Sequence, residues 1–337
     1  SAVTLRPLML LFAVSFAACS SPDPVDHARW MSDVVASHPG RELTLADLCW
    51  PRSHDTGTYM ETLCRSSFSN ACNTQTQHLT MAGQLAAGAR AFDVRPERFE
   101  DGYVTHHTTQ CGGLGCLGTP LDQLLTELRA FLDTHPELVF IELGNYCGTG
   151  TDDAELIALI ESTLGERLHR EAEGETRLLS EQPLDDLMSP DGATGRAIVI
   201  WEGLASTPEL RRAGRFSRDQ LPVEGSWSNV TEVERLRADQ VGRFETFDFG
   251  GDSLFELSWT LTQDFTLATS CIRPESESAT SIRDLADLAN PALTPTLDAL
   301  IESGEIRAGR IPNVISLDFV DTWVTDECLR LTELNLR

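Results

Sequence analysis

Residues Ser53–Tyr59 have the sequence SHDTGTY and follow an apolar run, Leu43–Trp50, that predicts a strand. A histidine and a carboxylate therefore stand side by side where that strand ends, and Gly57 allows a tight turn whose backbone groups can meet a ligand. Two further strand-like runs, Ala91–Arg95 (AFDVR) and Tyr103–His107 (YVTHH), carry charged or imidazole side chains near their ends. Histidines, carboxylates and an arginine at the ends of short strands indicate acid–base chemistry on an anion.

The composition excludes several classes of function. The chain has 337 residues, 41% of them hydrophobic, which is enough for one large domain or two ordinary ones. It contains no lysine, which excludes a Walker-type phosphate loop, a Schiff-base lysine and a lysine general base. The net charge of −26 and a pI near 4.5 argue against nucleic acid as a partner and against electrostatic adhesion to anionic membranes. No protein partner is implied, and the acidic residues are interpreted as a solvated surface.

The N-terminus is typical of a targeting segment. Arg6 precedes an apolar run, Leu8–Ala18, that has the length of a secretory h-region and is too short to span a bilayer. Small residues followed by Cys19 resemble the bacterial lipoprotein cleavage box, which predicts lipidation of Cys19, and ordinary signal cleavage after Ala18 is the alternative. We therefore expect an exported protein, lipid-anchored at the cell envelope or secreted, with a signal segment at 1–19 and a tether at 20–39.

Cysteine usage supports export. Without Cys19, eight cysteines remain, which permit up to four disulfides in an oxidising compartment. Two pairs, Cys64/Cys72 and Cys111/Cys116, are close enough in sequence to staple loops. No C-x-x-C spacing occurs, so a zinc site is disfavoured and no metal is expected.

Strand-like and helix-like runs alternate along the rest of the chain, which predicts parallel strands covered by helices. The length fits a single α/β domain, a distorted (β/α) barrel of the TIM type over residues 40–328, followed by a C-terminal tail at 329–337. Residues 203–250 are rich in polar and glycine turns and are interpreted as a long excursion over the barrel. The predicted strands are Leu43–Cys49, Ala91–Arg95, Tyr103–His107, Leu138–Leu143, Ala197–Trp201, Leu254–Thr262 and Asn313–Phe319, and the predicted helices are Leu121–Leu132, Ala154–Leu168, Ser281–Leu288 and Thr296–Ile301.

The alternation of apolar and polar residues within each predicted strand indicates which side chains face the barrel lumen. Phe92 and Val94 face the helices, which leaves Asp93 and Arg95 pointing inward, and the same argument favours His107 over its neighbour as the inward histidine. Catalytic groups of such barrels lie at the carboxyl ends of the strands. The later strands contribute further inward polar groups: Glu142, Glu256, Ser258, Thr260, Ser316 and Asp318.

Two glycine-rich stretches carry weaker signals. GLGCLG at Gly113–Gly118 fits a dinucleotide-binding pattern, but it follows paired histidines and includes a cysteine, so a flexible or disulfide-tied loop is the preferred interpretation. GNYCGTG at 144–150, which includes Asn145, either lines a pocket or is a plain β-to-α turn. No G-x-S-x-G sequence is present, which disfavours a serine hydrolase of that type.

The chain resembles the catalytic X domain of phosphatidylinositol-specific phospholipase C at SHDTGTY (Ser53–Tyr59), at Gln84-Leu85 with GARAFDVR (88–95), and at His106-His107. It is most similar to the bacterial, metal-independent branch of that family. PELV at 136–139 and NVISLDFV at 313–320 continue the resemblance, which covers about residues 40–325. The resemblance implies a distorted TIM barrel, no cofactor, and a phospholipid or other phosphodiester substrate at a membrane surface.

The resemblance also implies roles for the matched residues. His54 corresponds to the general base that takes a proton from a sugar hydroxyl, and Asp318 to the carboxylate that orients this base. His107 corresponds to the general acid for the departing alkoxide, with Asp55 as its partner. The implied first step is internal attack of a neighbouring hydroxyl on phosphorus, which gives a cyclic phosphodiester and a free alcohol.

Two further residues belong to the implied phosphate site. Arg95 matches the arginine that neutralises the phosphoryl oxygens where the calcium-dependent branch places a metal ligand. Asp93 matches an acidic residue that supports this site. A guanidinium facing a phosphoryl transition state supplies charge stabilisation without a metal.

The match is incomplete where the family holds the head group. Arg52 stands where the family usually has glycine, and the Ala197–Trp201 strand is followed by glutamate rather than ending in arginine. Glu142, Asn145 and Glu256 are the candidate substrate-binding residues. Phosphodiester cleavage is thus better supported than inositol specificity. Two alternatives stay open: cleavage of another glycerophosphodiester, and a catalytically inactive barrel that binds a polyol phosphate at the cell surface.

Overall fold

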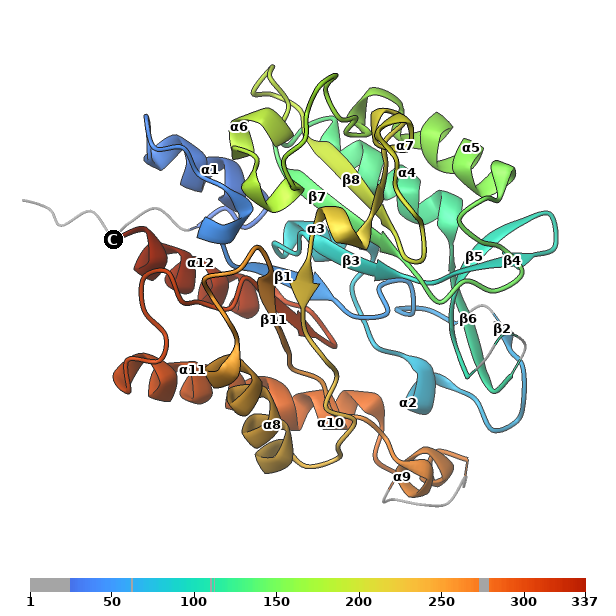
Figure 1. Cartoon of the computed structure of the whole chain (residues 1–337). Helices are drawn as coiled ribbons and strands as arrows, with labels where there is room; N and C mark the ends of the chain where they lie inside the picture. Colours follow the sequence, from blue (N-terminus) through green and yellow to red (C-terminus); the bar gives the residue numbers. More distant parts are fainter. Residues whose placement is uncertain (1–24, 62, 110, 112, 273–278) are drawn as a thin grey trace, which may run out of the picture.

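Eight parallel strands form the central sheet of the computed structural model (Figure 1), in the order β10-β11-β12-β1-β3-β7-β8-β9. The sheet curls into a barrel that is open between its edge strands β9 and β10, which confirms the predicted α/β fold of the TIM type. Parallel strands are buried on both faces, which explains why β7 is almost entirely apolar. The strands are β1 Trp50–Ser53, β3 Ala91–Val94, β7 Leu138–Leu143, β8 Arg196–Trp201, β9 Arg215–Ser217, β10 Val223–Glu224, β11 Leu254–Ser258 and β12 Val314–Leu317.

The structure describes residues 25–61, 63–109, 111, 113–272 and 279–337. The predicted signal segment at 1–19, with Cys19, lies outside these residues. Within them, none of the helices combines the length and the apolar character that crossing a bilayer requires.

Helices cover the outer face of the barrel. Helix α4 occupies Leu121–Leu132, as predicted, because its leucines recur at helical spacing and form one buried stripe. This stripe packs in one apolar cluster with Phe92 and Val94 of β3 and with Val139 of β7. The other helices are α1 Trp30–Ser37, α2 Ala71–Thr74, α3 Met81–Ala86, α5 Ala154–Leu164, α6 Leu184–Leu187, α7 Pro208–Arg212, α8 Val233–Thr246, α9 Phe265–Ser270, α10 Ile282–Ala289, α11 Leu293–Glu302 and α12 Thr322–Leu336.

The inner face of the barrel changes character along the strands. Toward the amino ends it is filled by apolar side chains, among them Trp50 and Phe140, whose rings stack with centroids 5.7 Å apart. Two residues further along the same strands the inward side chains are Arg52 and Glu142. Polar groups in the lumen are therefore confined to the carboxyl ends of the strands, which we call the mouth of the barrel.

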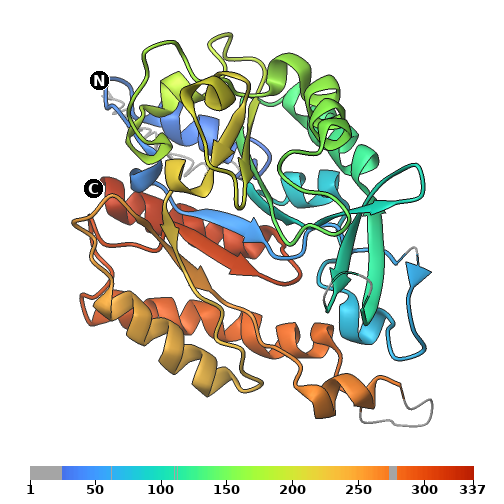
Figure 2. The ribbon, with the colours of Figure 1, turned by 45° about the vertical axis from the view of Figure 1, so that its right-hand side comes forward.

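A second, antiparallel sheet lies beside the mouth (Figure 2), in the order β2-β6-β5-β4. Its strands are β2 Leu63–Cys64, β4 Pro96–Phe99, β5 Gly102–Thr108 and β6 Gly115–Pro120. The predicted strand Tyr103–His107 belongs to this sheet and not to the barrel, because the short turn between β4 and β5 permits only antiparallel pairing.

Two other sequence predictions are corrected by the barrel strands. The first barrel strand begins at Trp50, and the preceding residues Leu45–Asp47 form a short 3₁₀ helix instead of a strand. Residues 203–250 are not an excursion, because they supply the edge strands β9 and β10 and the covering helix α8.

Both predicted terminal segments also fold onto the barrel. The stretch predicted as a tether contains α1, whose Trp30 and Met31 are 1% and 0% exposed. The stretch predicted as a tail is the end of α12, which buries Leu331 and Leu336. Neither segment is a linker at these residues, because each contributes apolar side chains to a core cluster.

A buried ion pair holds α1 in place. Arg90 and Glu137 are fully buried, precede β3 and β7, and approach to 2.7 Å between Nη2 and Oε2. The Glu137 carboxylate also accepts hydrogen bonds from the amides of Met31, at 3.2 Å, and Ser32, at 2.8 Å. These amides belong to the first turn of α1 and have no partner within the helix, so Glu137 serves as its cap.

Four disulfides join the eight remaining cysteines, as their number predicted. They do not join the two pairs of sequence neighbours, because Cys64 on β2 lies opposite Cys116 on β6 and pairs with it. The other bridges are Cys49–Cys328, Cys72–Cys271 and Cys111–Cys147.

Candidate active site

The mouth of the barrel brings together all six residues that sequence reasoning assigned to catalysis. His54 and Asp55 follow β1 directly, and Asp318 follows β12, the neighbouring strand. The remaining three come from β3 and from the second sheet: Asp93, Arg95 and His107.

Two carboxylates orient the His54 ring and stabilise its protonated form. Its Nδ1–H donates to Oδ1 of Asp318 at 2.8 Å, which fixes the ring and leaves Nε2 facing Asp55 and Arg95. Burial disfavours the charged imidazole, but Asp55 and Asp318 outweigh it and raise the pKa of His54 to about 9. An imidazole with this pKa is a strong base in its neutral form, but most of it is protonated at neutral pH.

Arg95 is fixed between two buried carboxylates. Its Nε lies 2.5 Å from Oδ1 of Asp55, and its Nη2 donates to Oδ2 of Asp93 at 3.0 Å. Burial opposes ionisation of Asp93, but Arg95 and Arg52 lower the pKa of this carboxyl far below its ordinary value. Arg95 Nη2 also lies 3.2 Å from Nε2 of His54, a contact that is a hydrogen bond only when Nε2 carries no proton.

His107 reaches the same carboxylate from the second sheet. Its Nδ1–H donates to the carbonyl of Thr74 at 2.8 Å, and its Nε2 lies 3.7 Å from Oδ2 of Asp55. The neighbouring His106 is buried, and its Nε2 donates to the carbonyl of Asn145 at 2.8 Å. The geometry thus separates the two histidines as strand alternation predicted, with His107 directed toward the site.

The turn after β1 holds Asp55 in an uncommon conformation. Asp55 has a φ of +45°, in the left-handed region that aspartate tolerates better than most residues. Gly57 follows because a Cβ there would lie 2.0 Å from the hydroxyl of Thr105. The Asp55 carbonyl accepts a hydrogen bond from Thr76, at 3.0 Å. The carboxylate is therefore aimed by the backbone as well as by Arg95.

Two of the predicted substrate-binding residues meet at Arg52. The Arg52 guanidinium donates to Oε2 of Glu142 at 2.7 Å and lies 3.5 Å from Oε1 of Glu256. Asn145 is not part of this group, and its backbone carbonyl accepts the hydrogen bond from His106.

The described residues contain three groups that could ligate a metal: Glu61/Cys64/Cys116, Glu97/His106/Cys147 and His54/Asp55/Asp93. The cysteines of the first two groups are in disulfides and offer no thiolate. In the third group the Arg95 guanidinium contacts both carboxylates and occupies the position that a cation would take. The donor set therefore suits an arginine better than a metal.

Comparison with protein-family models and with curated proteins gives no match. Comparison with solved structures does. The phosphatidylinositol-specific phospholipase C of Listeria monocytogenes superposes with a TM-score of 0.62 at 16% identity, covering 91% of this chain and 99% of that one. A Staphylococcus aureus structure of the same enzyme type gives 0.60 at 15% identity, covering 92% and 98%. The fold is that of the bacterial phosphatidylinositol-specific phospholipases C.

In this phospholipase C fold the strand ends converge, which is why strand alternation located most of the site. It missed three residues that come from loops. Gln77 donates from Nε2 to the carbonyl of His54 at 2.8 Å and accepts from the amide of Val320 at 3.0 Å, which ties the ends of β1 and β12 together. Thr76 supports Asp55, and Trp227 places a half-exposed ring 6.2 Å from that of His54. No periodicity marks these positions in the sequence.

Proposed function

We propose that the protein is a phosphodiesterase of the phospholipase C type that works by acid–base catalysis. One observation carries the proposal. Both imidazoles have Nδ1 engaged, and their Nε2 atoms lie 3.6 and 3.7 Å from the same oxygen of Asp55, beside the Arg95 guanidinium. Two imidazoles flanking one cationic group form a base, an acid and an anion clamp around a single position.

The chemistry follows from these roles. Nε2 of His54 takes the proton from a hydroxyl next to the phosphodiester, and the resulting oxygen attacks phosphorus. The phosphorus–oxygen bond to the leaving alcohol breaks, and Nε2 of His107 supplies the proton that this alkoxide needs. Arg95 balances the charge that develops on the phosphoryl oxygens. The products are a cyclic phosphodiester and a free alcohol.

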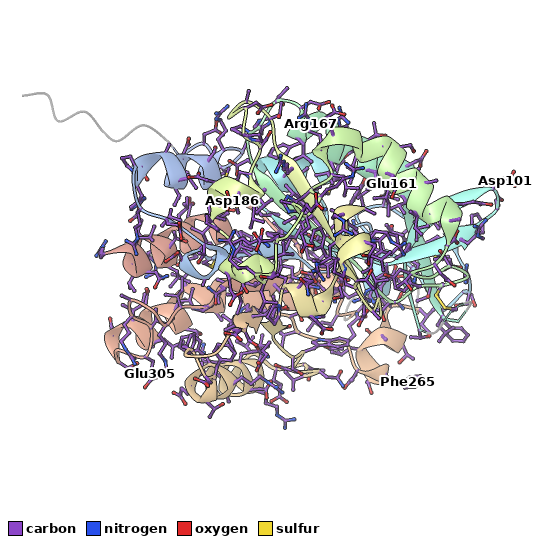
Figure 3. All side chains as sticks on the ribbon, turned by 45° about the horizontal axis from the view of Figure 1, so that its top comes forward. Asp101, Glu161, Arg167, Asp186, Phe265 and Glu305 are labelled. Carbon is purple, nitrogen blue, oxygen red and sulfur yellow. A yellow bond between two sulfur atoms is a disulfide. The ribbon has the colours of Figure 1, made fainter. Side chains whose placement is uncertain are left out.

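The surface around the mouth supports a phospholipid as the substrate. Residues 66–78 and 103–119, which include the groups that orient Asp55 and His107, contain no Asp, Glu or Arg, although 23% of the chain is charged. Phe68, Leu114, Trp227 and Phe265 are exposed there, and we call these four the apolar rim. Figure 3 shows Phe265 at the molecular surface on α9, which Asn73 links to Phe68 by hydrogen bonds to the carbonyls of Phe68 and Ala268. Exposed apolar side chains of this kind suit contact with a lipid surface.

The disulfides support an exported protein. Four bridges between parts of the chain that are distant in sequence are typical of proteins in an oxidising compartment. We propose secretion or anchoring at the cell envelope, with Cys19 as the residue that lipid would modify.

Product analysis by phosphorus NMR tests the function. Phospholipid vesicles incubated with the enzyme in EDTA should give the resonance of a five-membered cyclic phosphodiester. His54→Ala and His107→Ala should each lower the rate by about 10²–10⁴-fold, the usual contribution of general acid–base transfer. Turnover that requires added calcium, or hydrolysis with no cyclic product, would contradict the mechanism.

A further inference from the structure

Arg52 occupies the centre of the lumen directly beneath the catalytic groups. It precedes His54 by two residues on the same face of β1, so it lies roughly 6–7 Å deeper in the barrel. Its guanidinium contacts three other strands: Glu142 on β7 at 2.7 Å, Ser316 on β12 at 3.1 Å and Glu256 on β11 at 3.5 Å. The side chain is 11% exposed, so this ionic layer spans the lumen and closes it.

Little space remains around this layer. The cavity lined by Arg52, Glu142 and Glu202 has a volume of about 30 Å³, which is room for one or two water molecules. Glu202 closes its wall, since a Cβ on Gly144 would lie 2.3 Å from the Glu202 carboxylate. Below the layer the lumen is packed with apolar side chains, including Trp50 and Phe140. A head group therefore cannot descend past the catalytic groups.

We propose that Arg52 is a specificity-determining residue that restricts the head group to a small acyclic polyol, such as glycerol, and disfavours a six-membered ring. This inference rests on the proposed function. A short head group has its attacking hydroxyl and its remaining hydroxyl within one or two carbons of the phosphate, so it can stay at the mouth and send only a terminal hydroxyl, in place of one of these waters, toward the ionic layer. A ring carries hydroxyls on its far side, which would have to occupy the volume that Arg52 fills.

The layer also supplies a partner for such a head group. Glu142 keeps 20% of its side chain exposed toward the cavity, so its carboxylate can accept a hydrogen bond from a terminal hydroxyl. With a glycerol phosphodiester, the hydroxyl adjacent to the phosphate loses its proton to His54 and attacks phosphorus. The bond to the diacylglycerol oxygen breaks as His107 protonates it, and glycerol cyclic 1,2-phosphate results.

The test compares two phospholipids with identical acyl chains, phosphatidylglycerol and phosphatidylinositol, in the same neutral mixed micelles. The wild-type enzyme should give kcat/KM at least about tenfold higher for phosphatidylglycerol. Arg52→Gly should lower this ratio by raising kcat/KM for phosphatidylinositol. Arg52→Gly with Glu142→Gln removes the cation together with its nearest carboxylate, and it should shift the ratio in the same direction if the single variant does not fold. Arg129→Gln, a surface control, should leave the ratio unchanged.

The outcomes separate this inference from the proposed function. A wild-type preference for phosphatidylinositol, or a ratio that neither Arg52 variant moves, would overturn the role of Arg52 while cyclic product still supports the mechanism. If no phosphodiester yields a cyclic product, the proposed function itself fails, and the role of Arg52 fails with it.

Discussion

The amino end of the barrel and its mouth are stabilised by different means. At the amino end, apolar side chains fill the lumen and the fully buried pair Arg90–Glu137 joins β3, β7 and α1. One disulfide, Cys49–Cys328, lies at that end. At the mouth the lumen carries charges, and three disulfides crosslink the region: one within the second sheet, one between α2 and the end of α9, and one between the loops at Cys111 and Cys147.

This difference shows how the barrel separates folding from chemistry. Charged groups that face one another in a lumen cost desolvation energy, so they contribute less to stability than apolar packing does. The mouth therefore relies on covalent links to keep its loops in position. His107 illustrates the need, because its ring is oriented by Thr74, whose helix α2 is bridged to α9 through Cys72–Cys271.

The largest expected effect is loss of the arginine clamp at the mouth. Arg95→Ala should reduce kcat by about 10³–10⁵-fold, the range found when an arginine that stabilises a phosphoryl transition state is absent. Arg95→Lys should recover only part of this loss, since lysine lacks the fork that contacts Asp55 and Asp93 together. Steady-state kinetics measures the loss, and circular dichroism controls for folding. A lysine variant with wild-type kcat would contradict the clamp.

The second-largest expected effect is a loss of stability at the amino end of the barrel. Arg90→Ala leaves Glu137 charged and buried, which should cost about 3–5 kcal/mol in the free energy of unfolding. Urea unfolding measures it, and activity per folded molecule should stay near the wild-type value. Replacing both residues, Arg90→Met with Glu137→Leu, should cost less than Arg90→Ala alone. Equal losses in the two variants would mean that the unpaired charge is not the cause.

Removing one disulfide at the mouth and, separately, one at the amino end tests whether only the mouth needs a cross-link for activity. Cys72→Ser with Cys271→Ser and Cys49→Ser with Cys328→Ser should each lower stability by about 2–4 kcal/mol. Only the first variant should also lower kcat at low temperature, because α2 carries the carbonyl that orients His107. The measurement is kcat at 10 °C beside the urea midpoint. Equal kcat values for the two variants would show that the mouth does not need its cross-link.

The smallest effect concerns pH. His54 acts as a base only when neutral, so with a pKa of about 9 the value of kcat/KM should rise with pH, reach half its maximum near pH 9 and level off above it. Asp318→Asn removes one of the carboxylates that raise this pKa, so the rising limb should move to lower pH. Asp298→Asn, at the surface, serves as the control. If the rising part of the pH profile lies at the same pH in Asp318→Asn as in the wild type, His54 is not the group that titrates there.

The raised pKa of His54 also makes the stability of the fold depend on pH. A folded-state pKa of about 9, above the ordinary value of about 6.5, contributes stability that is fully present below pH 6.5 and is lost as the pH rises through 9. The wild type should therefore lose more thermal stability between these limits than Asp318→Asn does.

Sequence patterns predicted the parts of this molecule that repeat. Apolar alternation placed Asp93, Arg95 and Asp318 on the inner face, and the alternation of strands and helices predicted the barrel, because both depend on local periodicity. Strands β9 and β10 were not predicted, because segments of three and two residues are too short to show a period. The disulfide pairing escaped because neighbours in sequence need not be neighbours in space.

The residues around the head group could not be predicted for a different reason. Arg52 was visible as a departure from the family pattern, but its role depends on Glu142 and Glu256, which the fold brings to it from other strands. Helix α1 was not predicted for the same reason. Its first turn is completed by Glu137, so the segment has weak helical signals of its own.

The position of Glu137 also predicts an order of assembly. The amides of Met31 and Ser32 donate hydrogen bonds to a carboxylate that lies 106 and 105 positions later in the chain. An eight-residue helix is marginal by itself, so we expect α1 to form only after β7 has joined the sheet. We therefore expect α1 to dock late in folding, and pulsed hydrogen exchange at these two amides during refolding would time its docking.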